Sequence, residues 1–161
     1  MLLFSIFGDP VSHSISPRLH NSVLQALNLD GCYVRKVITD PEKLMATFHS
    51  MKLKGANVTV PHKEVAFAQC DEVRGLAKEI GAVNTLVREG TRVIGYNTDA
   101  EGFYEAIHSF GFLRNALILG AGGTAKAIAI ILKEHKIETT ILNRSASRLA
   151  FFEAKGFTCK T

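Results

Sequence analysis

The sequence lacks the features of a membrane, secreted or nucleic-acid-binding protein. Its longest apolar run after the N-terminus, Ala127 to Leu132, is far shorter than a membrane-spanning helix requires. The first ten residues have no basic segment, and their apolar stretch is too short for a signal peptide. No basic run reaches five residues, so the net charge of +4 favours a small phosphate-bearing ligand over nucleic acid. We expect neither a membrane nor a nucleic-acid partner.

Cysteine is also scarce. Cys32, Cys70 and Cys159 are odd in number and widely spaced, and no two of them form a C-x-x-C pair. This spacing excludes zinc ribbons and dithiol redox motifs. We expect no metal, and we interpret the three residues as ordinary thiols in a reducing compartment, which favours a cytoplasmic protein.

What is present is the composition of a globular protein, with 47% hydrophobic and 21% charged residues. The 161 residues suffice for one domain, or for one domain and part of another. The patterns predict strands at residues 2–7, 32–38, 57–60, 83–87, 92–96, 116–119 and 139–142, with a last strand beginning at 157–159. They predict helices at residues 16–28, 41–53, from 61 onward, 99–110, from the glycine loop to about 135, and 147–155.

A boundary is expected at residues 111–115. Residues 1–110 are predicted to form an α/β domain with a mostly parallel sheet, and residues 111–161 part of a Rossmann-like doubly wound domain. The second unit holds only one mononucleotide-binding half of such a domain. We therefore interpret the chain as a truncated protein, whose open sheet edge and exposed apolar faces would favour homodimer formation.

The glycine loop Gly120-Ala121-Gly122-Gly123-Thr124 follows an expected strand and opens an expected helix. This context is the one that the dinucleotide fingerprint requires. The first glycine permits the turn, the second permits close approach of the backbone to a pyrophosphate, and the small Ala125 permits close packing. The helix N-terminus adds unpaired N–H groups for phosphate. A glycine-rich turn that binds nothing is the alternative.

The residues after the next strand distinguish between the two nicotinamide cofactors. Asn143, Arg144 and Ser145 stand where NAD enzymes usually carry a carboxylate for the ribose hydroxyls. Arg144 offers a fork of donors to a 2′-phosphate, and Arg148 lies one helical turn further along. These residues favour NADP, unless both arginines are only solvated surface residues.

Polar side chains also follow two strands of the first unit. Thr59 and Lys63 lie at the end of the strand at 57–60, and Asp99 follows the strand at 92–96. Ligands of open α/β sheets bind outside such carboxyl ends, so we expect these side chains to lie at one site. Lys63 could instead be a solvated lysine, and Asp99 only a helix N-cap.

Further polar residues lie in two other segments. Ser14 and Ser16 carry hydroxyls that face one way in an extended segment, and Asn84 lies in a separate polar patch. Ser16 is also expected to be the N-cap of a helix with Pro17 at its first position. We expect the histidines of these segments to be structural or exposed rather than catalytic; they are His13, His20 and His62.

Together these segments resemble those of the shikimate dehydrogenases, and the resemblance covers the whole chain. The matching segments are 13–17, 57–63, 81–85, 95–102, 120–127 and 143–145, in the order of that family. The resemblance implies an NADP-dependent oxidoreductase of aromatic amino acid biosynthesis, which reversibly reduces 3-dehydroshikimate to shikimate. It also implies that the missing part of the family's chain holds the nicotinamide side, a glutamine that contacts substrate, and a helix that returns to the first domain.

The resemblance also implies the role of each residue. Lys63 and Asp99 would be the catalytic pair, and either of them could transfer the proton. The implied substrate-binding residues are Ser14, Ser16, Thr59, Lys63, Asn84 and Asp99. The implied cofactor-binding residues are Gly120, Ala121, Gly122, Gly123, Thr124, Asn143, Arg144, Ser145 and Arg148.

Three alternatives stay open at this point. The chain could be a non-catalytic fragment that binds shikimate or a nucleotide. It could belong to a dehydrogenase that also uses quinate, although Ser16, where the quinate-using members carry threonine, is more similar to the shikimate-specific members. A folate-dependent dehydrogenase is the third alternative, and segments 57–63 and 95–99 argue against it.

Overall fold

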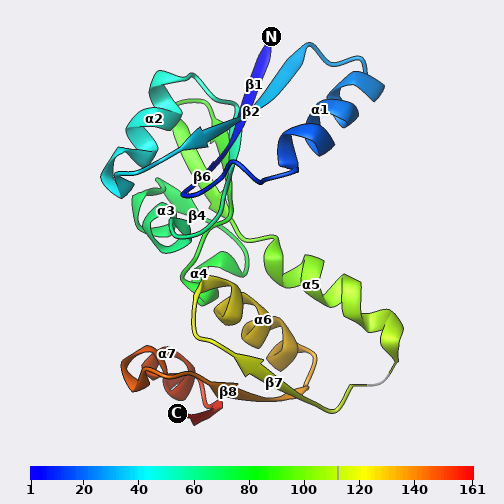
Figure 1. Cartoon of the computed structure of the whole chain (residues 1–161), viewed down its shortest axis with the longest axis vertical. Coiled ribbons are helices and arrows are strands. Elements are labelled where there is room, and N and C mark those ends of the chain that lie inside the picture. The colour runs from blue at the N-terminus through cyan, green and yellow to red at the C-terminus, as the bar shows by residue number, and fades with distance from the viewer. Residues whose placement is uncertain (112) are drawn as a thin grey trace.

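The computed structural model describes residues 1–111 and 113–161 as two α/β units, one above the other in Figure 1. The first unit contains a six-stranded sheet in the order β2-β1-β3-β5-β6-β4. Its strands are β1 (Leu2–Gly8), β2 (Gly31–Val37), β3 (Gly55–Val58), β4 (Glu72–Val73), β5 (Thr85–Glu89) and β6 (Arg92–Tyr96). Its helices are α1 (Ser16–Ala26), η1 (Pro41–Lys43), α2 (Leu44–Ser50), α3 (Lys63–Gln69), α4 (Ala77–Ile80), α5 (Asp99–Ile107) and η2 (His108–Phe110).

Strand direction in this sheet decides where the polar residues meet. Strand β1 pairs in parallel with β2 and β3, and β4 pairs in parallel with β6. Strand β5 is antiparallel to both β3 and β6, so β3 and β6 run in the same direction. Their carboxyl ends therefore lie at one edge of the sheet, where α3 and α5 begin.

Large apolar side chains hold the first sheet in place. Phe7 of β1, Leu53, and Leu44 and Phe48 of α2 are completely buried in one cluster. Leu44 and Phe48 are four residues apart and so lie on one face of α2. Burying each such side chain stabilises the fold by about 1.5–3 kcal/mol, which gives the site a rigid support.

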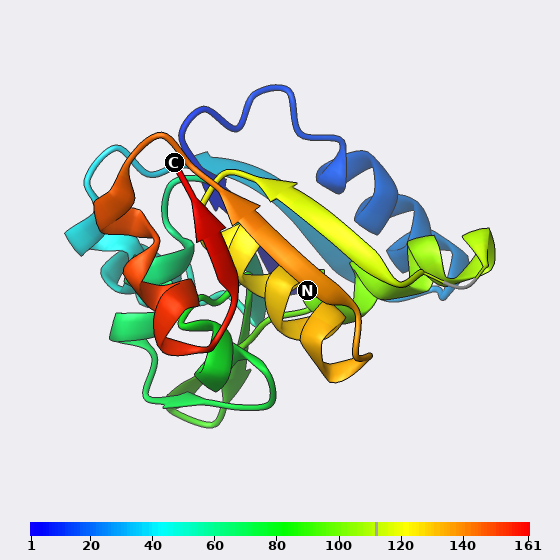
Figure 2. The same cartoon turned by 90° about the horizontal axis from the view of Figure 1, so that it is seen from below.

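The second unit has a three-stranded parallel sheet in the order β7-β8-β9. Its elements are β7 (Asn115–Leu119), α6 (Gly123–Glu134), β8 (Glu138–Leu142), η3 (Ala146–Arg148), α7 (Ala150–Ala154) and β9 (Thr158–Lys160). Figure 2 shows the three strands side by side with both helices behind them. This is the arrangement that two right-handed crossovers in one direction produce. The expected α/β class, with a mostly parallel sheet followed by a Rossmann-like unit, is confirmed.

The two units share an apolar cluster built by α4, α5 and α6. Ile80, Ala100, Ala127 and Ile130 are buried in it, and the alanines permit close helix approach. Helix α5 thus packs against α6 as well as extending from the first sheet (Figure 1). We retain 1–110 and 111–161 as a proposed division of the chain. Phe112, which falls within the expected boundary, lies outside the described residues.

Several expected boundaries were wrong. The helix expected at 41–53 divides into η1 and α2 and ends at Ser50, and the helix expected from 61 begins at Lys63. Ile15, not Ser16, is the N-cap of α1, and the N-cap side chain makes no capping hydrogen bond. The Ser16 hydroxyl instead accepts a hydrogen bond from that of Ser14.

Two short elements, β4 and α4, were not predicted. They have only two and four residues, too few for a periodic pattern to be detected.

Candidate active site

The candidate active site begins with an ion pair at the shared edge of β3 and β6. Lys63 is the first residue of α3, and Asp99 is the first residue of α5. The Lys63 Nζ atom lies 2.6 Å from Asp99 Oδ2, and the two side chains are only 12% and 28% exposed. Thr98, not Asp99, is the N-cap of α5, so the carboxylate is not occupied by capping its own helix.

Asn84 holds the second oxygen of the Asp99 carboxylate. Its Nδ2 atom donates to Asp99 Oδ1 at 2.7 Å, and its Oδ1 atom accepts from the Thr98 backbone N–H at 3.0 Å. Asn97 supports the same turn, because its Oδ1 accepts from the Asp99 N–H at 3.0 Å and its Nδ2 donates to the Ala82 carbonyl. The carboxylate is therefore fixed from both sides.

Ser14, Ser16 and Thr59 line a separate hollow of about 340 Å³. The Ser14 hydroxyl donates to that of Ser16 at 3.1 Å and accepts from the Ser16 backbone N–H at 3.2 Å. The Arg35 guanidinium donates to the Ser14 carbonyl and so anchors this loop to β2. The predicted substrate-binding residues thus form two groups in the structure, with Thr59 and Lys63 at opposite ends of the turn between β3 and α3.

The glycine loop joins β7 to α6 and faces the first unit. Gly120 has φ +114°, a conformation that side-chain-bearing residues rarely adopt. Gly122 is the N-cap of α6, and a Cβ atom on it would meet no other atom within 4 Å. The first N–H groups of α6, as first-turn groups, lack partners within the helix.

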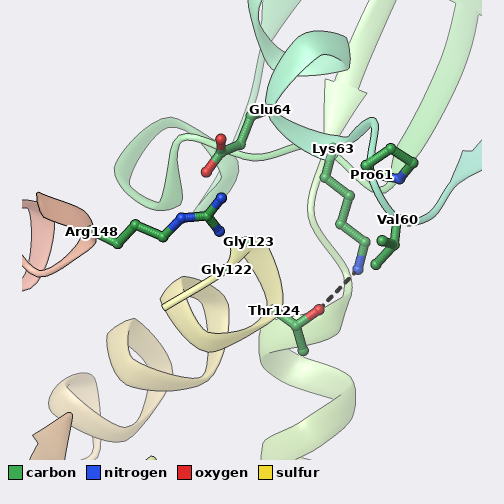
Figure 3. A pocket seen from close by; sticks show the side chains of 8 residues that line it. All are labelled: Val60, Pro61, Lys63, Glu64, Gly122, Gly123, Thr124 and Arg148. Carbon is green, nitrogen blue, oxygen red and sulfur yellow. Dashed lines mark hydrogen bonds between the residues drawn. The ribbon is translucent and has the colours of Figure 1, made fainter. Parts of the chain in front are cut away.

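A hollow of about 410 Å³ lies between the two units (Figure 3). The Lys63 Nζ atom donates to Thr124 Oγ1 across it at 3.3 Å, so one ammonium contacts both the Asp99 carboxylate and the glycine loop. Glu64 and Arg148 extend toward each other on the other side (Figure 3). The residues that line the hollow are Val60, Pro61, Lys63, Glu64, Gly122, Gly123, Thr124 and Arg148.

The residues after β8 differ in whether they face the hollow between the two units. Arg148 lines the hollow between the units, whereas Arg144 is exposed and does not line it. Asn143 uses its Nδ2 atom to donate to the Ser145 carbonyl at 2.9 Å, which fixes the turn between them. The order of these residues in the chain gave no sign of which arginine faces the hollow, because that depends on the direction of η3.

The histidines lie outside the ion-pair group. His62 is 2% exposed, and its Nε2 atom lies 2.7 Å from the Ile38 carbonyl. His20 stacks on Tyr33 with ring centroids 4.4 Å apart, and His13 borders the serine hollow. Among residues 1–111 and 113–161, no cluster of histidine, cysteine, aspartate or glutamate is arranged to hold a metal ion. Within the same residues, no helix has the length and apolar character to cross a membrane.

Sequence reasoning missed several residues that support the site. Asn97 and Thr98 orient Asp99 and Asn84, and Asn57 and Thr85 lie beside Asn84 in a continuing set of hydrogen bonds. The sequence feature that could have indicated these residues is the presence of polar side chains at the ends of otherwise apolar strands. The partners of those residues could not be inferred, because they lie on neighbouring strands.

Comparison with known proteins identifies the class and then the family. Residues 6–86 match the family model described as the shikimate dehydrogenase substrate binding domain. An NADP(+) shikimate dehydrogenase of Helicobacter hepaticus is 52% identical over 157 residues, which is 97% of this chain and 58% of that protein. The corresponding enzyme of Helicobacter pylori is 44% identical over 160 residues and is covered to 60%. The chain therefore spans about 60% of the length of these relatives.

A solved structure agrees with the sequence comparison. The Thermus thermophilus shikimate 5-dehydrogenase, in a complex with NADP(H) and shikimate, superimposes with a TM-score of 0.89 at 40% identity. The match covers 100% of this chain and 63% of that one. An α/β substrate domain faced by a dinucleotide-type glycine loop defines a two-unit protein of the dehydrogenase class. Within that class, the chain belongs to the shikimate dehydrogenase family.

Proposed function

We propose that this chain is the substrate domain and the first nucleotide-binding half of an NADP-dependent shikimate dehydrogenase. The observation that carries the proposal is the position of the Lys63 ammonium, 2.6 Å from Asp99 and 3.3 Å from Thr124 of the glycine loop. A single cation thus lies where a substrate on the first unit would meet a cofactor on the second. The relatives are named as NADP(+) shikimate dehydrogenases, and we propose that the reaction interconverts shikimate and 3-dehydroshikimate.

The chemistry assigned to the ion pair follows from charge. Reduction of a ketone places negative charge on its oxygen, and an ammonium in a sheltered site stabilises that charge. Lys63 is sheltered enough for this role, with 12% of its side chain exposed. Asp99 orients the ammonium through Oδ2, and Asn84 keeps the carboxylate from rotating. We propose that Ser14, Ser16, Thr59 and Asn84 hold the carboxylate and hydroxyls of the substrate.

The second unit fits a dinucleotide. We propose that Gly120, Ala121, Gly122, Gly123 and Thr124 hold its phosphates, because Gly122 leaves open space before the N-terminus of a twelve-residue helix. Glu64 also faces this hollow, but its carboxylate is paired with Lys126 at 2.5 Å. Bound NADPH would supply the hydride.

We propose that four residues after β8 hold the 2′-phosphate end of NADP. They are Asn143, Arg144, Ser145 and Arg148. Arg148 already lines the hollow between the units, which supports its contact with a ligand there. Arg144 and Ser145 are exposed, so both are free to reach a phosphate group.

The proposal is tested by titrating the chain with shikimate in a calorimeter, with quinate and NADP⁺ in parallel titrations. We expect shikimate to bind more tightly than quinate, and Asp99→Asn to weaken shikimate binding. Absence of shikimate binding by a folded chain would reject the substrate assignment. A chain that binds NADP⁺ alone would support the nucleotide-binding alternative.

A non-catalytic binding fragment is the second candidate function. The observation that favours it is the second sheet, which has three strands in the described residues, the size of one mononucleotide-binding half. Leu117 and Leu119 are also 61% and 73% exposed on the second unit. An assay of NADP⁺ reduction by shikimate, made with a protein of the relatives' length that carries this sequence, separates the two candidates, since only the enzyme turns over.

We further propose a cytoplasmic protein that binds a small molecule and neither membrane nor nucleic acid. The three free cysteines support a reducing compartment. The exposed Leu117 and Leu119 support association of two copies as a homodimer. Light scattering as a function of protein concentration tests the dimer, and salt-dependent binding to DNA would contradict the partner assignment.

A further inference from the structure

A line of polar side chains crosses the first sheet from β2 to the ion pair. The Tyr33 hydroxyl lies 2.6 Å from Asn57 Oδ1, and Asn57 Nδ2 lies 3.4 Å from Thr85 Oγ1. Thr85 Oγ1 lies 2.9 Å from Asn84 Oδ1, and Asn84 Nδ2 lies 2.7 Å from Asp99 Oδ1. The contacts run without interruption from β2 through β3 and β5 to the start of α5.

The last asparagine of this line has only one possible orientation. The Thr98 backbone N–H can only donate, and it points at Asn84 Oδ1 from 3.0 Å. The Asp99 carboxylate can only accept when ionised, so Asn84 must present its Nδ2 there. Both constraints agree, which fixes the oxygen and the nitrogen of the Asn84 amide.

This orientation propagates back along the line. Thr85 has a single hydroxyl hydrogen, which it donates to Asn84 Oδ1. Its oxygen is then an acceptor for Asn57, so Asn57 must turn Nδ2 toward it. The Asn57 oxygen is left facing Tyr33, which donates to it. Every hydrogen bond in the line thus points toward the Asp99 carboxylate.

Tyr33 is held firmly at the start of the line. Its side chain is buried, and the Asn21 side chain bonds both its backbone N–H and its carbonyl, at 2.8 Å and 2.9 Å. Burial raises the pKa of the Tyr33 hydroxyl well above its usual value, and contacts with Asn57 and Ser16 oppose that rise only in part. The hydroxyl therefore keeps its proton near neutral pH and can donate.

We propose that Tyr33 and Thr85 are positioning residues that fix the amide orientations of Asn57 and Asn84 and, through them, the Asp99 carboxylate. Without the Thr85 hydroxyl, the Asn57 side-chain amide loses its acceptor and can exchange the positions of its oxygen and nitrogen. A flipped Asn84 would direct an oxygen at the Asp99 carboxylate. The consequence for substrate binding rests on the proposed function, whereas the hydrogen-bonded line itself does not.

Nuclear magnetic resonance of the ligand-free chain tests the line directly. The side-chain amide signals of Asn57 and Asn84 are assigned in ¹⁵N spectra of the wild type, Thr85→Val and Thr85→Ser. We expect Thr85→Val to shift both amide signals and speed their exchange with water, because the shared hydroxyl is lost. Thr85→Ser keeps a hydroxyl and should restore both. Tyr33→Phe should shift the Asn57 signal more than that of Asn84.

Matched controls come from the second unit and α5. Thr139 is also a strand threonine, and its hydroxyl bonds the Ile137 carbonyl at 3.0 Å, so Thr139→Val makes the same chemical change elsewhere. Tyr104→Phe is the control for Tyr33→Phe. Neither control should move the Asn57 or Asn84 signals. Unchanged Asn57 and Asn84 signals in a folded Thr85→Val chain would overturn the proposal.

Calorimetric titration with shikimate then measures the effect on the site. We expect Thr85→Val and Tyr33→Phe to weaken shikimate binding by about three- to ten-fold, the usual worth of one hydrogen bond. Thr85→Ser should bind as the wild type does. If the amide signals respond as expected but the wild type does not bind shikimate, the proposed function fails and the positioning line stands. If shikimate binds equally to all variants, the line has no role in positioning the site.

Discussion

The Lys63 ammonium and the Asp99 carboxylate are 2.6 Å apart although 36 positions separate them in the chain. Each residue begins a helix directly beyond the carboxyl end of a strand, and the two strands run in one direction because β5 is antiparallel to both. The pair also connects the two units, since the same ammonium donates to Thr124 of the glycine loop in the second unit. A change at Lys63 should affect chemistry more than binding, whereas a change at Asp99 should also weaken shikimate binding.

We expect Lys63→Ala, made in an enzyme of the relatives' length that carries this sequence, to lower kcat by about 10²–10⁴-fold. Shikimate affinity should fall much less, because the ammonium matters most as charge develops on oxygen. Steady-state kinetics with binding measured separately gives the comparison. Lys78→Ala, an exposed lysine on α4, is the control. An unchanged kcat in the Lys63 variant would remove Lys63 from the mechanism.

The cofactor assignment predicts a preference for NADPH over NADH. In the same full-length enzyme, Arg144→Asp or Arg148→Asp should reduce or reverse that preference, because a carboxylate repels the 2′-phosphate. The ratio of kcat/KM for the two cofactors is the measurement, and Lys43→Asp on the first unit controls for the change in net charge. Equal kcat/KM values for NADPH and NADH in the wild type would contradict the assignment.

The chain alone should bind shikimate but turn over little or not at all. Its proposed substrate residues lie around the six-stranded sheet of the first unit, whereas a dinucleotide spans two mononucleotide halves and the described second sheet has three strands. Hydride transfer needs reacting atoms held about 3–3.5 Å apart. Calorimetry with shikimate beside an assay of NADP⁺ reduction checks both parts. Turnover at the rate of the relatives would show this expectation to be wrong.

Cys70 should be an unreactive thiol. Burial, helped by the nearby Asp71 charge, raises the pKa of the Cys70 thiol from 9.0 to about 12. The folded protein therefore keeps the thiol protonated to higher pH than the unfolded chain does. Its contribution to stability is complete below about pH 9 and is lost as the pH rises toward 12.

Alkylation by iodoacetamide at pH 8, followed by mass spectrometry, measures this reactivity. Cys70 should stay unmodified in the folded chain and react in urea. Equal rates in the two conditions would contradict the expectation. Cys70→Ala should also lessen the fall in stability between pH 9 and 12, a window set by the raised pKa.

The Glu64–Lys126 pair should couple the two units weakly. The Glu64 and Lys126 side chains are 57% and 17% exposed, and their charged atoms are 2.5 Å apart. Because Glu64 is largely solvated, a double-mutant cycle with Glu64→Gln and Lys126→Met should give a coupling of about 0.2–1 kcal/mol. Denaturant unfolding at low and high salt measures it, and the coupling should shrink as salt rises. A coupling that salt leaves unchanged would point to packing instead of charge.

The local sequence determined the class of the fold and most of its elements. The apolar runs and the glycine loop at 120–124 carry short-range information, because strand periodicity and glycine conformation depend on neighbouring residues. For the same reason, Lys63 and Asp99 could be placed at strand ends before the structure was known.

Only the tertiary structure decided which side chains meet. Strand β5 runs antiparallel between β3 and β6, and this arrangement brings Lys63 and Asp99 to the same edge of the sheet. Strand order of this kind cannot be inferred from local patterns. The line from Tyr33 to Asn84 crosses neighbouring strands, and the position of Arg148 at the hollow depends on the turn of η3. Such contacts join residues far apart in the chain, so they arise from packing of whole elements and not from any local preference.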